Sequence, residues 1–314
     1  MRSLVTGGAG FIGSTLVDAL LARGDEVTIV DDLSTGRLQN LEAALRAGAE
    51  LIELDIRDRP ALEAAVAAAA PQTVFHLAAQ IDVRLSVADP AFDASINVGG
   101  TANVLEAVRA TSVPRLVFAS TGGAIYGEGE GRTLPLAEDA VLAPFSPYGQ
   151  SKQAAELYLA LYQRLYGTSS ICLRLGNVYG PRQDPLGEAG VIAIFCGLLG
   201  EGKRPTVFGD GLQTRDYIFV EDVVAAMLAA STSDLSGPVN VGTGVETDVL
   251  ALARALGDLA GVPFEPEFAP PRTGEVQAIT IDPSRAEAEL GWRPQTTLSE
   301  GLEITLRSLS ASAA

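Results

Sequence analysis

The chain has 314 residues, of which 47% are hydrophobic and 19% charged, and this composition predicts a folded globular protein rather than a disordered one. Its 39 acidic and 22 basic residues give a formal net charge of -17, so nucleic acid and anionic membrane surfaces are not expected partners. One histidine and two cysteines, Cys172 and Cys196, exclude a disulfide scaffold and a multi-histidine or cysteine-based metal centre. No apolar run approaches the roughly 20 residues of a membrane span. We therefore expect a cytoplasmic protein without a metal.

The N-terminal half alternates short apolar segments with amphipathic ones. Strands are expected over residues 3–7, 26–31, 49–55, 73–78, 115–120 and 169–175. Helices are expected between them, over residues 11–23, 38–47, 60–69, about 91–110 and 148–166. Continuous apolar strands that alternate with helices are typical of a parallel sheet covered on both faces. The pattern therefore predicts an α/β fold with a doubly wound parallel Rossmann sheet.

After about residue 176 the pattern loosens, and glycine and proline cluster between shorter elements. Helices are expected at about 190–200, 221–231, 247–260, 284–290 and 298–309, with short strands in TVFG and PVNVG. We expect residues 1–176 to form the Rossmann domain and residues 177–314 to form mainly a smaller, interleaved C-terminal lobe. Regions 217–225 and 237–243 are expected to return to the first domain.

A glycine-rich turn joins the first strand to the first helix. Gly7, Gly10 and Gly13 have a GxxGxxG spacing, and Phe11 and Ile12 lie between the last two glycines. Such a turn needs glycine where the backbone must approach a pyrophosphate and where helix and strand must pack closely. The N–H groups at the start of the helix then face the phosphates. The turn is therefore a candidate dinucleotide site.

The second strand ends at Asp31, 18 residues after Gly13. This spacing is close to the ~20 residues expected for the acid that binds the adenosine ribose hydroxyls. A carboxylate would repel a 2′-phosphate, so NAD is favoured over NADP, although Arg37 lies close by. Asp55, at the end of the third strand, is expected near the adenine.

Tyr148 and Lys152 lie four residues apart in SPYGQSK, where Ser146 and Pro147 indicate a helix start. Both side chains then lie on one face of the first turns. A lysine ammonium one turn away is expected to lower the pKa of the phenol, and the positive ring of NAD would add to this effect. The pair is therefore a candidate for proton transfer near neutral pH.

Two hydroxyl residues, Ser120 and Thr121, end the strand over residues 115–120, where doubly wound folds place ligands. Either hydroxyl can bind a substrate oxygen and share its proton with Tyr148. We favour Thr121, with Ser120 as the second candidate.

Together these motifs resemble the extended short-chain dehydrogenase/reductase family, specifically its NAD-dependent sugar-nucleotide epimerases and dehydratases. The resemblance covers nearly the whole chain. The matching segments are TGGAGFIG (6–13), VDDLSTG (30–36), HLAAQ (76–80), FASTGGAIYG (118–127), SPYGQSK (146–152), LRLGNVYGPRQDP (173–185), RDYIFVEDV (215–223), NVGTG (240–244) and LGWRP (290–294). Within the family, the similarity is greatest to the isomerases that epimerise UDP-hexoses at C4.

The resemblance implies an enzyme that inverts C4 of UDP-glucose or UDP-galactose through a transient 4-keto intermediate, with NAD kept bound. Tyr148 would take the proton of the 4-hydroxyl, Lys152 would anchor the nicotinamide ribose, and Thr121 would assist. The residues implied along NAD are Gly7, Gly10, Phe11, Ile12, Gly13, Asp31, Asp32, Asp55, Ile56, Leu77, Ala78, Ala79, Asn97, Tyr148 and Lys152. The residues expected around the UDP-sugar are Thr121, Tyr148, Asn177, Arg182, Val191, Phe208, Arg215 and Arg272.

The arginines have an independent rationale. A dianionic substrate that enters a protein of charge -17 needs local cations, and guanidinium groups bind phosphates through two hydrogen bonds. Arg182, Arg215 and Arg272 all lie in the later lobe. By contrast, we expect His76 to be a satisfied core residue, and Asp216 and Asp222 to be structural.

Several alternatives remain. A 4,6-dehydratase needs an acid and a base after the strand-end threonine, where this chain has Gly122 and Gly123. UDP-glucuronate is a less favoured substrate, because Asp184 stands where related glucuronate epimerases have arginine. UDP-N-acetylglucosamine stays open, since Ile279 stands at the position of a bulky tyrosine in some relatives. A simple reductase and a non-catalytic NAD-binding protein are further alternatives.

The helices over residues 91–110 and 148–166 carry apolar residues on more than one face. In relatives, the corresponding helices pair across a two-fold axis. The resemblance thus implies a homodimer.

Overall fold

The structure is a computed structural model, which describes residues 1–129, 131–185, 190–262, 265–271 and 276–312. Its central layer is a seven-stranded parallel sheet with the order β10-β6-β5-β4-β1-β2-β3. The strands are β1 (Arg2–Thr6), β2 (Glu26–Asp31), β3 (Glu50–Glu53), β4 (Thr73–His76), β5 (Arg115–Thr121), β6 (Ser170–Leu175) and β10 (Gly237–Val241). The strand order reverses between β1 and β4, so ligands are expected at the carboxyl ends of these strands. The predicted Rossmann sheet is confirmed.

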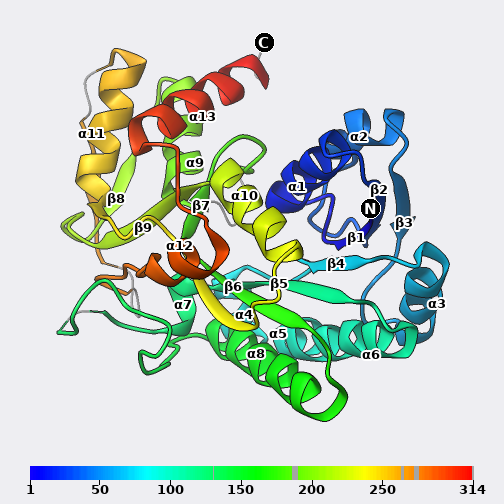
Figure 1. Ribbon diagram of the computed structural model, residues 1–314. Coiled ribbons are helices and arrows are strands. Elements are labelled where there is room, and N and C mark those ends of the chain that lie inside the picture. The colour runs from blue at the N-terminus through cyan, green and yellow to red at the C-terminus, as the bar shows by residue number, and fades with distance from the viewer. Residues whose placement is uncertain (130, 186–189, 263–264, 272–275, 313–314) are drawn as a thin grey trace.

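Helices cover both faces of the sheet (Figure 1). One face packs against α1 (Phe11–Ala22), α10 (Val220–Ser231) and α12 (Ser284–Leu290). The other face packs against α3 (Arg59–Ala69), α6 (Thr101–Thr111) and α8 (Pro147–Tyr166). Because both faces are buried, the strands read as continuous apolar runs.

The helix predicted over about 91–110 is confirmed as one helical run over residues 90–111, which contains a widened turn. The chain forms α4 (Val83–Ala88), α5 (Pro90–Ala94), one widened π-helical segment η2 (Ser95–Gly100) and then α6. Asn97 lies in the widened segment, where its amide donates to the Gln80 carbonyl at 2.8 Å and accepts from the Gln80 N–H at 2.9 Å. Such single widened turns inside α-helices occur frequently at functional sites.

The helix predicted over 38–47 is divided, into a 3₁₀ turn η1 (Leu38–Leu41) and a short α2 (Glu42–Arg46). Asn40 donates to the carbonyl of Ala9 at 2.9 Å, which ties the turn to the glycine-rich loop. The predicted strands 49–55 and 73–78 extend only to Glu53 and His76, because the chain leaves the sheet there to form the loops of the site.

The second lobe has a three-stranded sheet with the order β11-β9-β7 and a two-stranded pair of β12 and β8. Its strands are β7 (Asn177–Tyr179), β8 (Thr206–Phe208), β9 (Thr214–Phe219), β11 (Glu246–Asp248) and β12 (Glu267–Ala269). Its helices are α9 (Val191–Gly200), α11 (Val249–Ala260) and α13 (Leu298–Ser312). A separate apolar cluster, which includes Phe195, Phe219 and Leu252, forms the core of this lobe.

The chain crosses between the lobes several times. β10 pairs with β6 in the main sheet, so the stretch 237–243 returns to it. The stretch 217–225 is divided, because β9 belongs to the small sheet whereas α10 packs against the main one.

The three residues that we expected to be structural rather than catalytic are held by hydrogen bonds within the fold. His76 is fully buried between the hydroxyls of Thr6 and Thr101, at 2.8 and 3.0 Å. The Asp216 carboxylate accepts four hydrogen bonds that join β9 to the segments after β10 and before α12. Asp222 accepts the backbone N–H groups of residues 295 and 296, both at 3.0 Å. Within the described ranges, every helix is too short or too polar to cross a bilayer.

Candidate active site

The glycine-rich loop between β1 and α1 leaves room for backbone only. Gly7 has φ +72°, and a Cβ atom there would lie 2.6 Å from the backbone nitrogen of Ala78. A Cβ atom on Gly13 would lie 2.1 Å from the Gly7 carbonyl oxygen. Gly10, the N-cap residue of α1, has no side chain to cover the N–H groups of Phe11 and Ile12. These features fit a pyrophosphate at the start of α1.

Asp31 ends β2 and is nearly buried. Its carboxylate accepts the backbone N–H of Ala9 at 2.8 Å and that of Leu33 at 2.9 Å. Burial raises the pKa of Asp31. The side chain therefore holds the glycine-rich loop against the end of β2, while the adjacent Asp32 binds Ser34 at the surface.

The other predicted cofactor residues follow β3 and β4. Asp55 pairs with Arg57 at 2.6 Å, and hydrogen bonding to this arginine lowers the pKa of Asp55. Ile56 is buried and contacts the Gly100 position in η2. Leu77, Ala78 and Ala79 follow β4, and Asn97 is held beside them by Gln80. All of these positions lie at the carboxyl edge of the sheet.

Tyr148 and Lys152 lie in the first turns of α8, as predicted. The Ser146 hydroxyl caps the helix by accepting the Gly149 N–H at 3.1 Å, and Pro147 is the first helical residue. Lys152 is 4% exposed; its Nζ donates to the Ala119 carbonyl at 2.9 Å and lies 4.7 Å from the centre of the Phe118 ring. The ammonium is thus held under the end of β5.

The predicted lowering of the phenol pKa is not produced by the groups of the chain itself. Burial raises the pKa of Tyr148 to about 12, with a smaller opposing effect from the nearby Thr121 side chain. Burial also lowers the pKa of Lys152 to about 8, against the charges of Asp93 and Glu156. A tyrosinate at neutral pH therefore requires positive charge beyond that of Lys152.

Ser120 and Thr121 point to different partners. The Thr121 side chain lies close enough to the Tyr148 phenol to act on its pKa, whereas the Ser120 hydroxyl donates to Oε1 of Glu156 at 2.5 Å. Successive residues of a strand face opposite sides of the sheet, so only one of the two can meet Tyr148. The arrangement favours Thr121 as the partner of Tyr148.

A buried ion pair lies next to this group and was missed by sequence reasoning. Glu156, one turn after Lys152 on α8, accepts from Nη2 of Arg174 on β6 at 2.7 Å. Arg174 also donates to the Tyr126 hydroxyl at 2.9 Å, and Tyr126 in turn donates to Asn240. The signal in the sequence was an acidic residue four positions after Lys152, on the face that packs against the sheet.

The predicted substrate residues are partly brought together. Asn177 begins β7, and its Oδ1 is buried without a hydrogen-bond partner, 3.1 Å from the place of a Cβ atom on Gly123. Such an unpaired buried acceptor favours a donor from a ligand. Val191 begins α9 and Phe208 ends β8, and both are half-buried in the second lobe.

Of the three predicted arginines, the two that the structure describes have separate partners. Arg182 donates to Asp18 on α1 at 2.5 Å, so it joins the 180–185 segment to the Rossmann domain. Arg37 pairs with Asp184 of the same segment and is thereby engaged by a carboxylate. Arg215 lies on β9 and donates to the Thr214 carbonyl at 2.8 Å. Arg272 lies outside the described residues.

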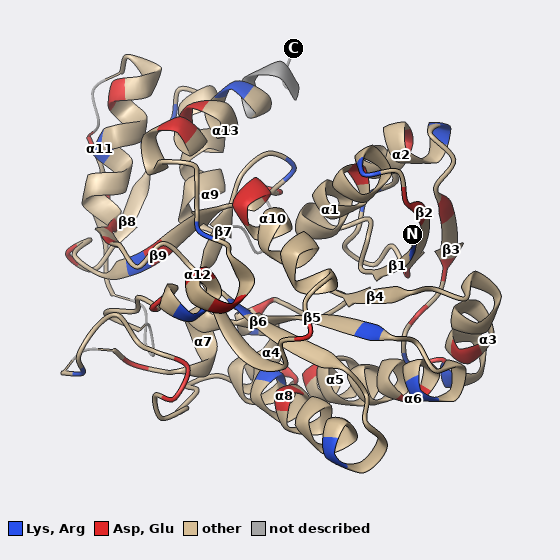
Figure 2. Ribbon diagram, viewed as in Figure 1, with Lys and Arg blue, Asp and Glu red and all other residues tan. Residues whose placement is uncertain are grey.

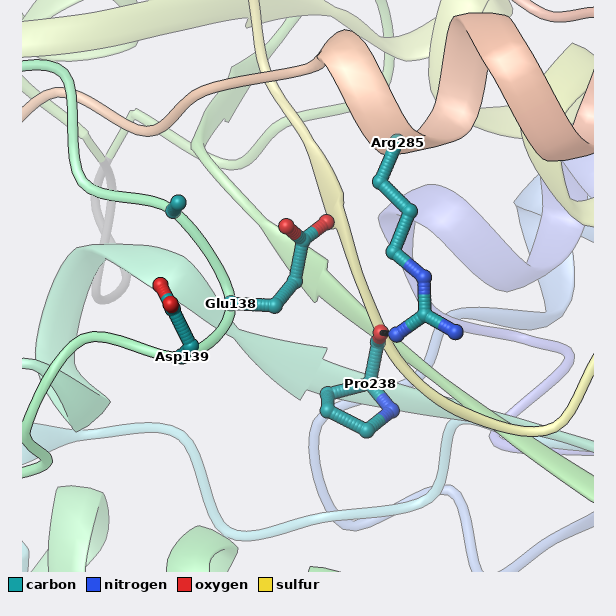
Figure 3. A pocket seen from close by; sticks show the side chains of 5 residues that line it. Glu138, Asp139, Pro238 and Arg285 are labelled. Atoms are coloured by element: carbon teal, nitrogen blue, oxygen red, sulfur yellow. Dashed lines mark hydrogen bonds between the residues drawn. The ribbon is translucent and has the colours of Figure 1, made fainter.

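A pocket of about 430 Å³ lies along the edge strand β10 (Figure 3). Arg285 donates to the Pro238 carbonyl at 2.7 Å, and Glu138 and Asp139 face the same space. None of the predicted site residues lines it. The pocket is therefore separate from the Tyr148 cluster.

Comparison with known proteins agrees with this geometry. Residues 3–242 match the model of the NAD dependent epimerase/dehydratase family. The chain belongs to this family. A UDP-glucose 4-epimerase of Mycolicibacterium smegmatis is 48% identical to it over 308 residues, which cover 98% of this chain and 97% of that protein.

Two solved structures of epimerases resemble this family member closely. The crystal structure of the Thermotoga maritima UDP-glucose 4-epimerase with UDP-glucose has a TM-score of 0.96, 43% identity and 100% coverage of both chains. The Thermus thermophilus UDP-glucose 4-epimerase in complex with NAD has a TM-score of 0.91 and 43% identity, with 98% of this chain and 99% of that chain covered. The family and the fold thus agree with those predicted from the motifs.

The residues present in this epimerase/dehydratase fit NAD. The glycine-rich loop leaves space that a Cβ atom would fill, and the N–H groups of α1 face it. The Asp31 carboxylate lies at the end of β2, where it would accept ribose hydroxyls, and Arg37, the cation that would favour a 2′-phosphate, is paired with Asp184. The NAD-dependent family and the site agree on the cofactor.

Gly13→Ala is expected to abolish NAD retention, because the new Cβ atom would lie 2.1 Å from the Gly7 carbonyl oxygen and displace the loop. The measurement is the NAD content of the purified protein, released by denaturation. Gly99→Ala is the matched control, since its Cβ would meet its nearest neighbour at 3.9 Å. Equal NAD content in both variants would contradict the assigned role of the loop.

Proposed function

We propose that this protein is an isomerase of the UDP-glucose 4-epimerase type, which inverts C4 of a UDP-hexose, UDP-glucose or UDP-galactose, through a transient 4-keto sugar. The observation that carries the proposal is the group formed by Thr121, Tyr148 and Lys152 at the carboxyl end of β5. The close relatives support the same activity, since both structural neighbours described above are UDP-glucose 4-epimerases.

Each residue of this group has a separate role in the proposed reaction. Bound NAD supplies a hydride acceptor whose reduced form is a hydride donor. Tyr148 takes the proton from the sugar 4-hydroxyl and later returns it, with Thr121 as its neighbour. Lys152 holds a buried ammonium one helical turn after Tyr148, and bound NAD would supply the further positive charge that the ionised phenol needs. The orphaned Asn177 oxygen is a candidate acceptor for a sugar or nucleotide donor.

A dehydratase is less well supported by the local packing. A Cβ atom at Gly122 would lie 2.7 Å from Cδ1 of Ile281, and one at Gly123 would lie 3.1 Å from Oδ1 of Asn177. There is little space for the acid and base that elimination requires at these positions. Ile279, the position relevant to acetamido sugars, is buried in a cluster with Tyr126 and Leu136.

The test is incubation of the purified protein with UDP-glucose, UDP-glucuronate and UDP-N-acetylglucosamine, without added cofactor. We expect NAD to copurify and UDP-glucose to equilibrate with UDP-galactose, as followed by NMR of the sugar. Conversion of none of the three would overturn the proposal. Consumption that depends on added NAD(H) would indicate a simple reductase instead.

We also propose that the protein is a homodimer that pairs through α8. Of the three charged residues of α8, Lys152 and Glu156 are buried, so the outer face carries few charges (Figure 2). Leu157 and Leu165 are 64% and 61% exposed there, and Val87 of the neighbouring α4 is 60% exposed. An exposed apolar surface of this kind favours packing against the same helices of a second copy of the chain. A monomeric mass by light scattering at micromolar concentration would contradict the dimer.

We place the protein in the cytoplasm. Both cysteines, Cys172 and Cys196, are buried and unpaired, which fits a reducing compartment. Cell fractionation with an antibody tests the location.

A further inference from the structure

Asp93, on the short helix α5, is a fully buried carboxylate outside the motifs that define the site. Its Oδ1 accepts the hydroxyl of Ser151. Its Oδ2 accepts the side-chain amides of Gln80 at 3.0 Å and Asn97 at 3.1 Å. All three partners are uncharged donors, so the hydrogen bonds need no proton on Asp93. This geometry leaves a negative charge without a cation in direct contact.

The three donors come from three different parts of the site. Gln80 follows β4 in the loop that approaches Gly7, and Asn97 lies in the widened turn η2. Ser151 lies in α8, between Tyr148 and Lys152. A single carboxylate therefore ties the first turns of the catalytic helix to the two segments expected along the cofactor.

Two buried charges near Tyr148, those of Glu156 and Lys152, differ in whether an opposite charge contacts them. Glu156 has a cation in direct contact, because it pairs with Arg174 at 2.7 Å, and the two side chains are 9% and 4% exposed. Lys152 is also buried, but its Nζ donates to the neutral carbonyl of Ala119. A buried ammonium is costly without an opposite charge nearby, and in a region of low dielectric a carboxylate acts on it beyond contact distance.

We propose that Asp93 is a positioning residue of the Tyr148–Lys152 pair, which anchors α8 through Ser151 and supplies the counter-charge that keeps Lys152 an ammonium. The inference rests on the proposed function, in which this pair moves the proton. Consistent with the geometry, the charge of Asp93 raises the pKa of both Tyr148 and Lys152, in addition to the larger effect of burial on each.

The other titratable groups around the pair come from β4, β6 and α8. Burial, and then the charge of Lys152, lower the pKa of His76 to about 3, so its ring is neutral at working pH. Burial raises the pKa of the Cys172 thiol well above its usual range, so it is also neutral. Glu156 is paired with Arg174, and its charge raises the pKa of Lys152 but does not act on Tyr148. Among the described residues, Asp93 is therefore the carboxylate whose charge acts on both Tyr148 and Lys152, so its removal should shift both.

The test replaces Asp93 by asparagine and measures turnover of the holoenzyme against pH. Removal of a negative charge disfavours the ammonium and favours the phenolate, so both pKa values should fall. We expect both limbs of the turnover profile to move to lower pH by about one unit, which is a tenfold change in each ionisation constant. The KM for UDP-glucose should change little.

Ser151→Ala is the matched control, because it removes the anchor and keeps the charge. Its maximum turnover should fall, whereas the two pKa values of its pH profile should stay unchanged, as expected for a purely structural loss. Asp93→Ser is a second charge-removing variant should the asparagine protein not fold. The double variant Asp93→Asn/Gln80→Glu, which moves the carboxylate to the neighbouring side chain, should restore the limbs.

Absorbance titration of the Tyr148 phenolate, as the difference between each protein and its Tyr148→Phe counterpart, needs no substrate. The phenolate of Asp93→Asn should titrate at lower pH than that of the wild type. Unmoved limbs and an unmoved phenolate in folded charge-removing variants would overturn the role of Asp93 and leave the epimerase proposal intact. A wild-type protein without epimerase activity would overturn the proposed function, while the phenolate titration would still test Asp93.

Discussion

The Tyr148→Phe protein is expected to lose about 10²–10⁴-fold in turnover of UDP-glucose, the range of a lost general acid–base group. Phenylalanine keeps the ring in place but removes the hydroxyl that meets Thr121. Since the sugar nucleotide is held mainly by other residues, KM should change little. The measurement is the initial rate of C4 inversion, followed by NMR or by a coupled assay for UDP-galactose.

Tyr166→Phe is the matched control on the same helix, because Tyr166 is 54% exposed at the far end of α8. Its turnover should equal that of the wild type. NAD content should be the same in both proteins, which separates proton transfer from cofactor loss. If Tyr148→Phe kept more than a tenth of the wild-type rate, another group would have to move the proton.

Glu156→Ala is expected to lower the free energy of unfolding by about 3–5 kcal/mol, because it leaves the buried Arg174 guanidinium without its carboxylate. The Ser120 hydroxyl also loses its acceptor, at 2.5 Å from Oε1 of Glu156. Urea unfolding followed by circular dichroism measures the change. A loss of this size is measurable in urea unfolding independently of any effect on turnover.

An exposed ion pair supplies the comparison. Glu289 pairs with Arg285 at 2.9 Å across one turn of α12, and both side chains are partly in solvent. Glu289→Ala should therefore cost about 0–1 kcal/mol. The double variant Glu156→Leu/Arg174→Met, which removes both buried charges, should be more stable than Glu156→Ala. Equal losses for Glu156→Ala and Glu289→Ala would contradict the assigned role of the buried pair.

Much of the cofactor side of the site was predictable because its signals are local. Gly7, Gly10 and Gly13 lie within one turn, and Asp31 follows at the end of the next strand. Tyr148 and Lys152 are separated by one helical turn, so their common face follows from helix geometry alone. The substrate side was less predictable, because Arg182 contacts Asp18, a residue 164 positions away in the sequence.

The widened turn inside the helix predicted over 91–110 shows what a local pattern leaves out near a site. The apolar periodicity of this segment is helical, and α6 confirms it for residues 101–111. The Asn97 amide, however, binds the backbone of Gln80, and the widened turn η2 brings it there. Nothing in the periodicity reports a hydrogen bond to a loop that follows another strand.

The order of strands and helices, the glycine-rich loop and the spacing of Tyr148 and Lys152 can all be predicted from the amino-acid sequence, because each depends on the local periods of the backbone. The choice of Thr121 over Ser120 as the neighbour of Tyr148 follows from the three-dimensional packing, since the face that each residue presents depends on how β5 lies against α8. The tertiary structure likewise joined Asp93 to Ser151, 58 positions apart. Buried hydrogen bonds between distant segments are set by packing, and no local pattern encodes them.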